Sequence, residues 1–153
     1  MVSGYGASAA AHHATAPDPL SAGAELAVRS ALSDAGVAGT DVTHVNAHRT
    51  STPLNDVSEA RMIRRVVGQH PAVTSSKGVV GHALGAAGVI EAVATVLTIE
   101  NGFVPPTAKP ENLDPEADLD VVAKAGRELP VEVAVSDSFG FGGQNAVLVF
   151  SKA

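Results

Sequence analysis

Residues 74–99 read TSSKGVVGHALGAAGVIEAVATVLTI, and the rest of the chain can be arranged around this stretch. It opens as a short loop that carries Lys77 and His82 and continues as a long run of small and aliphatic residues interrupted by Glu91. A segment that is apolar on all sides over a helical length predicts a helix buried on every face. The glycines within it would each cost about 0.5–1 kcal/mol relative to alanine. Their presence therefore indicates that other backbones approach this helix closely.

A membrane span is the rival interpretation of this stretch, since a span needs about 20 apolar residues. His82 and Glu91 lie inside the stretch, and basic residues are absent from its flanks. Both features favour a buried helix with charged chemistry at its entrance, so we expect no membrane span.

Composition limits the classes of function. The 153 residues are 45% hydrophobic and only 3% aromatic, which predicts one domain with a tightly packed aliphatic core. The net charge of −6 argues against nucleic acid or an anionic membrane as the main partner. No cysteine occurs, which leaves no disulfide, thiolate metal site or cysteine nucleophile in this chain. The first residues lack the pattern of a signal peptide, so we expect a cytoplasmic location.

Local signals divide the chain into strands that alternate with helices and then strands alone. Asp18 as N-cap, Pro19 at the first position and Gly36 as the stop define the first helix. The expected elements are the end of a strand at 2–10, helices at 19–35 and 53–67, strands at 42–47 and 72–75, the central helix, a Pro-rich connection at 104–115, and strands at 119–123, 131–136 and 146–151. This order predicts α/β layers with a mostly parallel sheet that carries an antiparallel edge.

Candidate catalytic side chains follow two of these strands. His48 comes just after a strand, at the end where α/β folds place ligand sites. His82 lies at the mouth of the central helix, where burial of an unpartnered ring would be costly. Lys77 would offset a developing negative charge, although most lysines simply reach solvent. A buried Glu91 must be paired or protonated, so we expect it to hold Lys77 as a structural ion pair.

Two other kinds of site are excluded by spacing. The histidines at 12, 13, 48 and 82 form no short-range metal-ligand pattern, and no metal site is expected. The GFGG sequence at 140–143 is too short for a phosphate loop and opens no helix. Its free backbone N–H groups would instead suit an oxyanion hole.

Taken together, these residues resemble the C-terminal half of a β-ketoacyl-acyl carrier protein synthase, and in particular the elongating type II enzymes of fatty-acid and mycolic-acid synthesis. The motifs appear in family order along essentially the whole chain. They are GYG at 4–6 with His13 and Thr15, NAHRTSTP at 46–53, SKGVVGH at 76–82, GAAG at 85–88, PPT at 105–107 and SFGFGGQN at 138–145.

The resemblance implies one half of a thiolase-like fold, which is a mixed five-stranded sheet covered by helices. Residues 1–153 would form the C-terminal ketoacyl synthase domain. Within it, 1–40 would be the end of a preceding strand and a connecting helix, and 41–153 the core half. The complete family members are usually dimers, so we expect a homo-oligomer if the protein is complete.

The resemblance also implies an acyltransferase that performs a decarboxylative Claisen condensation between an acyl-cysteine and malonyl-acyl carrier protein. His48 and His82 would bind the thioester carbonyl and stabilise the enolate, with Lys77 fixing His82. Phe141 would gate the acyl pocket while its N–H serves the oxyanion hole. Substrate binding is implied for Thr50, Thr52, His13, Thr15 and Phe139, and structural roles for Glu91, Glu59 and Asn145. The family implies no cofactor beyond the phosphopantetheine that the acyl carrier protein carries.

Departures from the family pattern limit what this chain would do alone. The family nucleophile is a cysteine of the first half, so the isolated chain is expected to be inactive without that half. Arg49 stands where the family usually has Gly or Ala, and a long cation there would block the pocket or force another backbone conformation. Asp137 replaces a common Asn. The expected partners are acyl carrier protein and either the missing N-terminal half or a full-length synthase.

A second hypothesis is a non-catalytic protein that binds acyl carrier protein or pairs with a complete synthase. Arg49 and the missing half favour it, whereas the intact set of His48, Lys77 and His82 disfavours it. A chain-length factor is less well supported because such partners need not keep both histidines. A generic α/β binding domain would require the ordered motifs to be coincidental.

Overall fold

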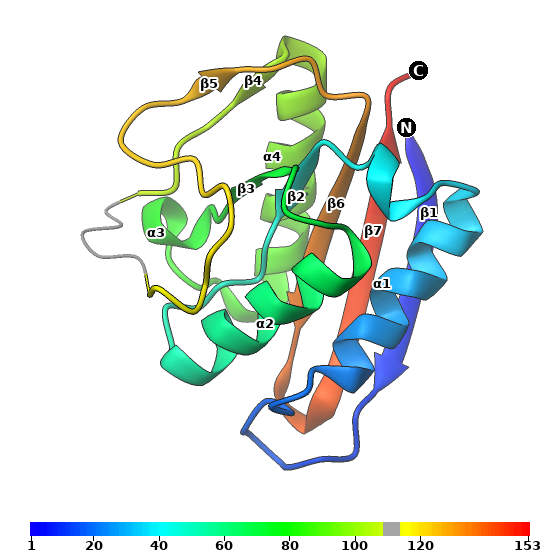
Figure 1. Ribbon diagram of the computed structural model, residues 1–153, viewed down its shortest axis with the longest axis vertical. Coiled ribbons are helices and arrows are strands. Elements are labelled where there is room, and N and C mark those ends of the chain that lie inside the picture. The colour runs from blue at the N-terminus through cyan, green and yellow to red at the C-terminus, as the bar shows by residue number, and fades with distance from the viewer. Residues whose placement is uncertain (109–113) are drawn as a thin grey trace.

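The computed structural model describes residues 1–108 and 114–153, and a mixed five-stranded sheet forms its centre (Figure 1). The strand order is β1 (Val2–Ala9), β7 (Gln144–Ser151), β6 (Val133–Phe139), β2 (His44–Asn46) and β3 (Ala72–Thr74). β2 is parallel to both β3 and β6, whereas β7 is antiparallel to both neighbours. The predicted α/β class with a mixed five-stranded sheet is therefore confirmed.

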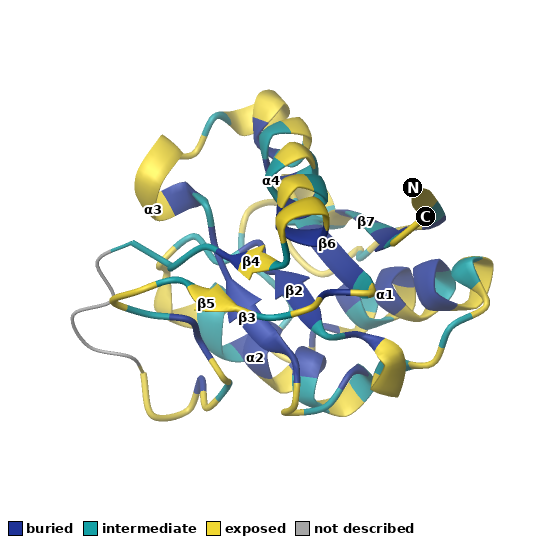
Figure 2. Ribbon diagram, turned by 90° about the horizontal axis from the view of Figure 1, so that it is seen from above, coloured by how far each residue is buried: buried dark blue, intermediate teal, exposed yellow. Residues whose placement is uncertain are grey.

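Helices cover both faces of the sheet (Figure 2). α1 (Ala22–Ala35) and α2 (Pro53–Val66) pack on one face and α4 (Ala87–Asn101) on the other. A short α3 (Lys77–Val80) and a 3-10 turn (Leu84–Ala86) connect β3 to α4. One aliphatic core lies beneath α1 and α2, and a second lies between α4 and the sheet around Phe150. The core is thus aliphatic, as the composition indicated.

The ends of the helices were predicted with mixed success. The helix at 53–67 is confirmed as α2, and Gly36 ends α1 in the left-handed conformation as expected. α1 begins at Ala22 rather than at Pro19, because Ser21 adopts a left-handed conformation (φ 52°) that a helix cannot include. Asp18 still accepts hydrogen bonds from Leu20 N (3.0 Å) and Ala22 N (2.9 Å), so it caps the turn before the helix.

The segment 119–123 was predicted as a strand, and that prediction is wrong. It makes only isolated bridges, Val121 to Val73 and Ala123 to Thr107. Because β3 is only three residues long, it offers no continuous ladder for this segment to extend. A two-stranded ribbon of β4 (Phe103–Val104) and β5 (Arg127–Glu128) was not predicted. Part of the expected Pro-rich connection lies outside the described residues.

The prediction that the central helix is buried on every face is wrong. One side of α4 packs on β6 and buries Glu91, Thr95 and Thr98. The opposite side exposes Val89, Val93 and Leu97, which follow one another at helical spacing. We call these three side chains the α4 apolar stripe. The sequence is apolar around the whole circumference of the helix, whereas the sheet covers only one side.

The stretch Leu84–Asn101 is long and apolar enough by composition to cross a membrane. Its inner side contacts the sheet and carries the buried carboxylate of Glu91. These two features are those of a core helix with one uncovered face.

The close packing of α1 on β1 depends on glycine in the strand. A Cβ added at Gly6 would overlap the carbonyl oxygen of Ala27 in α1. We expect Gly6→Ala to lower the free energy of unfolding by about 1–3 kcal/mol, because the helix must move off the strand. The measurement is denaturant unfolding with Gly85→Ala as control, since a Cβ at Gly85 meets open space. Equal stability of the two variants would contradict this account of the packing.

Candidate active site

A cavity of about 980 Å³ lies at the carboxyl ends of the central strands. His48 follows β2, His82 follows α3, and Phe139 ends β6, so three separate connections bring these side chains to one place. The expected site residues that line the cavity are Thr15, His48, Thr50, Thr52, His82, Phe139, Phe141 and Asn145. The expected site residues that do not line it are His13, Glu59, Lys77 and Glu91.

The two histidines face each other in this cavity. The ring centroids of His48 and His82 are 5.7 Å apart and the rings stand nearly perpendicular, at 82°. Phe139 lies on another side of the His48 ring, with centroids 5.7 Å apart. Burial, followed by the charges of Lys77 and His82, lowers the pKa of His48 to about 3. His48 is therefore a neutral imidazole at physiological pH.

The backbone sets the orientation of His82. Its Nδ1 accepts a hydrogen bond from the N–H of Leu84 (3.3 Å), which leaves Nε2 as the ring nitrogen that donates. In His48, Nδ1 is buried without a partner in the described part of the chain, and the residue lines the cavity. His82 itself is exposed, so the argument that its burial would be costly does not apply.

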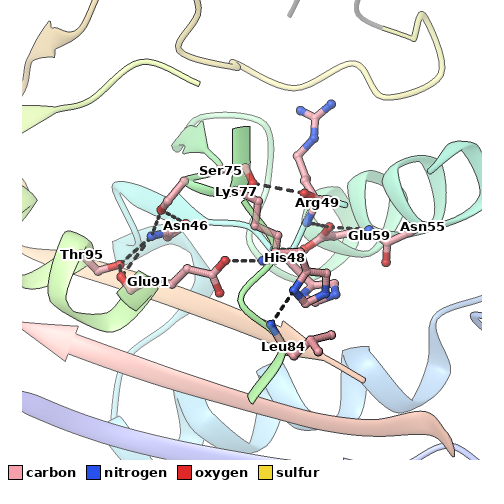
Figure 3. A network of polar contacts seen from close by, with 12 residues as sticks. Asn46, His48, Arg49, Asn55, Glu59, Ser75, Lys77, Leu84, Glu91 and Thr95 are labelled. Atoms are coloured by element: carbon pink, nitrogen blue, oxygen red, sulfur yellow. Dashed lines mark hydrogen bonds and ion pairs between the residues drawn. The ribbon is translucent and has the colours of Figure 1, made fainter. Parts of the chain in front are cut away.

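An ion pair between Lys77 and Glu91 lies beside the histidines, as the sequence predicted (Figure 3). Both side chains are almost fully buried. Burial raises the pKa of Glu91, and the hydrogen bond and charge of Lys77 oppose that rise. The pair is neutral overall, and its Lys77 end lies close enough to His48 to lower the pKa of that ring.

Asn46 joins this pair to β2, a role that the sequence analysis missed. Its side-chain amide donates to the backbone oxygen of Glu91 (3.1 Å) and to Oγ1 of Thr95 (3.2 Å) in α4. The same amide lies 3.3 Å from Oγ of Ser76, just before Lys77. Its place at the end of a buried strand, within the NAHRTSTP motif, was the available signal.

Glu59 holds the backbone on which His48 stands. Its two carboxylate oxygens accept hydrogen bonds from the N–H of His48 (2.7 Å) and of Arg49 (2.9 Å). The side chain comes from α2 and is only 2% exposed. Burial raises its pKa to about 7 against the opposing effect of these N–H groups. The contact fastens the turn after β2 to α2.

Arg49 does not block the cavity, contrary to the sequence-based expectation. Its side chain points away from His48 (Figure 3) and is not part of the cavity lining. The guanidinium pairs instead with Asp56 of α2, with Nε to Oδ2 at 3.4 Å. Its backbone is also outside the left-handed region, so no unusual conformation is imposed. The direction of the side chain depends on α2, which the local sequence does not reveal.

The FGFGG turn is fastened to the loop of residues 10–16. Gly142 N donates to Ala14 O and Ala10 N donates to Gly143 O, both at 2.8 Å. Phe141 projects from this turn and is 77% exposed, and its N–H finds no acceptor among the described residues. A free N–H at the cavity is what an oxyanion hole needs.

Two more of the expected residues shape the cavity rim. The hydroxyls of Thr50 and Thr52 lie 3.0 Å apart, because Ser51 between them has a left-handed backbone (φ 60°). Nδ1 of His13 accepts the N–H groups of Thr15 (3.1 Å) and Ala16 (3.0 Å). His13 thus shapes its own loop in this structure.

Asp137 is a buried carboxyl group near the site, and one of its oxygens lacks a hydrogen-bond partner among the described residues. It is 1% exposed, and its Oδ1 has no hydrogen-bond partner within residues 1–108 and 114–153. Burial, followed by the charges of Glu59 and Glu91, raises its pKa well above the model-peptide value of 3.8. The folded protein therefore holds a proton on Asp137 more tightly than the unfolded chain does.

Stability should consequently fall as pH rises above the ordinary aspartate value of 3.8, because Asp137 then ionises more readily in the unfolded chain than in the folded protein. Asp137→Asn keeps the shape and removes the proton, so we expect its Tm to decline less steeply over this range. Thermal unfolding of both proteins at several pH values tests this. Parallel pH profiles of the two proteins would contradict it.

The sequence is similar to that of known β-ketoacyl synthases over most of its length. The sequence profile described as "Beta-ketoacyl synthase, C-terminal domain" matches residues 1–111. The 3-oxoacyl-acyl-carrier-protein synthase 2 of Synechocystis sp. is 51% identical over 152 residues, which are 97% of this chain and 36% of the relative. The enzyme of the same name from Staphylococcus aureus is 45% identical over 97% of this chain and 37% of its own length. The chain thus spans little more than a third of these curated relatives.

Solved structures of ketosynthases are also similar to this chain, and it again covers little more than a third of each. The ishigamide ketosynthase/chain length factor is 39% identical with a TM-score of 0.94, over 99% of this chain and 38% of the other. A type II polyketide ketosynthase, solved with its acyl-carrier protein and bound to a hexaketide, is 34% identical with a TM-score of 0.95, over 99% and 38% of the two chains.

Proposed function

The chain belongs to the β-ketoacyl synthase family as its C-terminal domain, and from this membership we propose that it carries the malonyl-decarboxylating half of a condensing active site. Members of this family are condensing enzymes of fatty-acid and polyketide synthesis with a thiolase-like fold. They need no cofactor of their own, because phosphopantetheine is carried by the acyl carrier protein. The observation that carries the proposal is the facing pair of imidazole rings, His48 and His82, at one cavity.

The proposed chemistry follows from the donors at the cavity. A malonyl thioester would enter with its carbonyl oxygen between Nε2 of His82 and Nε2 of His48. The bond to the carboxylate carbon breaks, CO₂ leaves, and the electron pair remains as an enolate whose oxygen these imidazoles hold. Donors that hold this oxygen more strongly as it gains charge accelerate the step. The buried Lys77–Glu91 pair places the ammonium end of a neutral pair near the histidines.

The second step joins the enolate carbon to an acyl thioester carbonyl and expels a thiolate. No cysteine occurs among the 153 residues, so the acyl-carrying cysteine would lie on a segment beyond them. In this proposal the N–H of Phe141 stabilises the tetrahedral oxyanion, and its ring gates the acyl pocket. Thr50 and Thr52 bind the phosphopantetheine arm at the cavity rim, with Thr15 and Phe139 completing the substrate-binding surface.

The partners, the cellular location and the assembly are also proposed from membership of the family. Acyl carrier protein delivers the malonyl group, in the cytoplasm, and the product enters fatty-acid, mycolic-acid or polyketide synthesis. The α4 apolar stripe would be covered by the remaining part of the ketosynthase fold or by a full-length synthase, because such a surface favours burial. The complete assembly is proposed to be a homo-oligomer.

A non-catalytic role, in binding acyl carrier protein or pairing with a synthase, is the alternative. The lack of cysteine in these residues and the ketosynthase/chain length factor pairs among the structural neighbours favour it. One experiment separates the two. The purified chain is mixed with the cysteine-bearing N-terminal half of a related ketosynthase and given malonyl-acyl carrier protein and an acyl donor.

If the halves associate, release CO₂ and form the β-ketoacyl product, the catalytic proposal is supported. Association without CO₂ release would overturn it in favour of the pairing role. Light scattering measures association, and trapping of labelled CO₂ measures the first chemical step independently of condensation.

A further inference from the structure

We propose that Arg49 is a positioning residue whose guanidinium neutralises Asp56 and thereby lets Glu59 hold the turn that carries His48. Its catalytic consequence rests on the function proposed above, whereas its structural part rests on the contacts alone. The family resemblance gives Gly or Ala at this position, so the role would be a property of this chain.

Glu59 must be ionised to accept hydrogen bonds from two backbone N–H groups at once. One carboxylate accepts two backbone N–H groups, those of His48 (2.7 Å) and Arg49 (2.9 Å), with one oxygen for each. A protonated carboxyl group has a hydroxyl that donates, so it would accept well from only one of them. Protonation of Glu59 would therefore release one end of the turn beneath the His48 ring.

A like charge lies beside Glu59. The side-chain amide of Asn55 is 3.3 Å from Oδ1 of Asp56 and 3.3 Å from Oε2 of Glu59, so both carboxylates contact the same amide. Repulsion between the two favours protonation of the more buried one, and the charge of Asp56 does raise the pKa of Glu59.

Arg49 supplies the opposing charge. Its Nε and Nη2 lie 3.4 Å and 3.5 Å from Oδ2 of Asp56. The two side chains are only 12% and 13% exposed, so water screens the pair weakly. The charge of Arg49 lowers the pKa of Glu59. Through its backbone N–H and its side chain, one residue is fastened to α2 at two points.

The other charged groups near Glu59 do not replace this cation. Asp137 of β6 lies close enough for the charge of Glu59 to raise its pKa, and as an acid it supplies no cation. Lys77 is already bonded to Glu91. On the remaining side, Oγ of Ser75 donates to the carbonyl of Arg49 (3.2 Å), which ties the turn to the end of β3 without adding charge.

The structural test follows the amide protons of His48 and residue 49 by NMR as pH is varied, in the whole protein that contains these residues. Removal of the cation in Arg49→Gln should move the midpoint of their titration to higher pH. Arg49→Lys should restore it. Arg61→Gln serves as the matched control, because Arg61 is an exposed arginine of α2 paired with Glu116. An unchanged midpoint in Arg49→Gln would overturn the proposal.

The catalytic test is the pH dependence of CO₂ release. We expect Arg49→Gln to be about threefold to tenfold slower than wild type at pH 6.5 and to approach it at pH 8.5, where Glu59 ionises without help. Equal rates at both pH values in a folded variant would overturn the positioning role. A wild-type protein that releases no CO₂ would contradict the proposed function, and the amide titration would then still decide the structural part.

Discussion

Lys77→Met should lower the free energy of unfolding by about 3–5 kcal/mol, because it leaves Glu91 as an unpaired charge in the interior. Lys77 and Glu91 form a buried ion pair, and Oε2 of Glu91 has no other partner within the described ranges of the chain. The variant can recover only by protonating the carboxylate or by admitting water. Denaturant unfolding at pH 7 measures the loss.

The matched control for this prediction is the double variant Lys77→Met/Glu91→Leu. It removes both charges and fills the same space with apolar groups, so it should recover most of the lost stability. If the single variant loses less than about 1 kcal/mol, or if the double variant is no better than the single one, the pair is not the strong buried contact described here.

His82→Ala should slow the release of CO₂ from a malonyl thioester by about 10²–10³-fold, with little change in KM. The reason is that Nε2 of His82 donates to an oxygen whose negative charge develops only as CO₂ departs. Loss of a donor that acts on developing charge affects kcat rather than substrate binding. The rate is measured with the assembled halves at saturating malonyl-acyl carrier protein.

His70→Ala is the control, since His70 lies at the opposite end of β3 and bonds to the backbone oxygen of Val42 (2.8 Å). It should retain nearly the full rate. A His82→Ala variant as fast as this control, or one changed only in KM, would contradict the proposed role of His82 in charge stabilisation.

Much of the fold was predictable because local signals and tertiary packing agree. The helix expected at 53–67 is α2, and Gly36, expected as the stop of the first helix, ends α1. The sheet class followed from the order of strands and helices. Where a residue takes an unusual backbone conformation, as Ser21 does, the local pattern failed and the helix start was placed too early.

The rest of the fold depended on contacts that no local pattern records. The exposed side of α4 could not be predicted because the apolar residues have no periodic gap, so only the position of the sheet decides which side is covered. In the same way, the direction of Arg49 depends on Asp56 in the following helix.

The sequence predicted which residues form the candidate site better than it predicted the contacts among them. His48 and His82 were expected together because the family resemblance implies that both bind the thioester carbonyl. The pairing of Lys77 with Glu91 followed from the cost of burying a lone carboxylate. The contacts of the Asn46 amide and the raised pKa of Asp137 depend on neighbours in space, which the sequence does not show.

The most direct test of the central claim is a crystal structure of the assembled protein with a non-decarboxylating malonyl thioester analogue. The account predicts that the thioester carbonyl oxygen lies about 3 Å from Nε2 of both His48 and His82. An analogue bound with this oxygen away from both imidazoles, or with its malonyl group outside the cavity, would contradict the account.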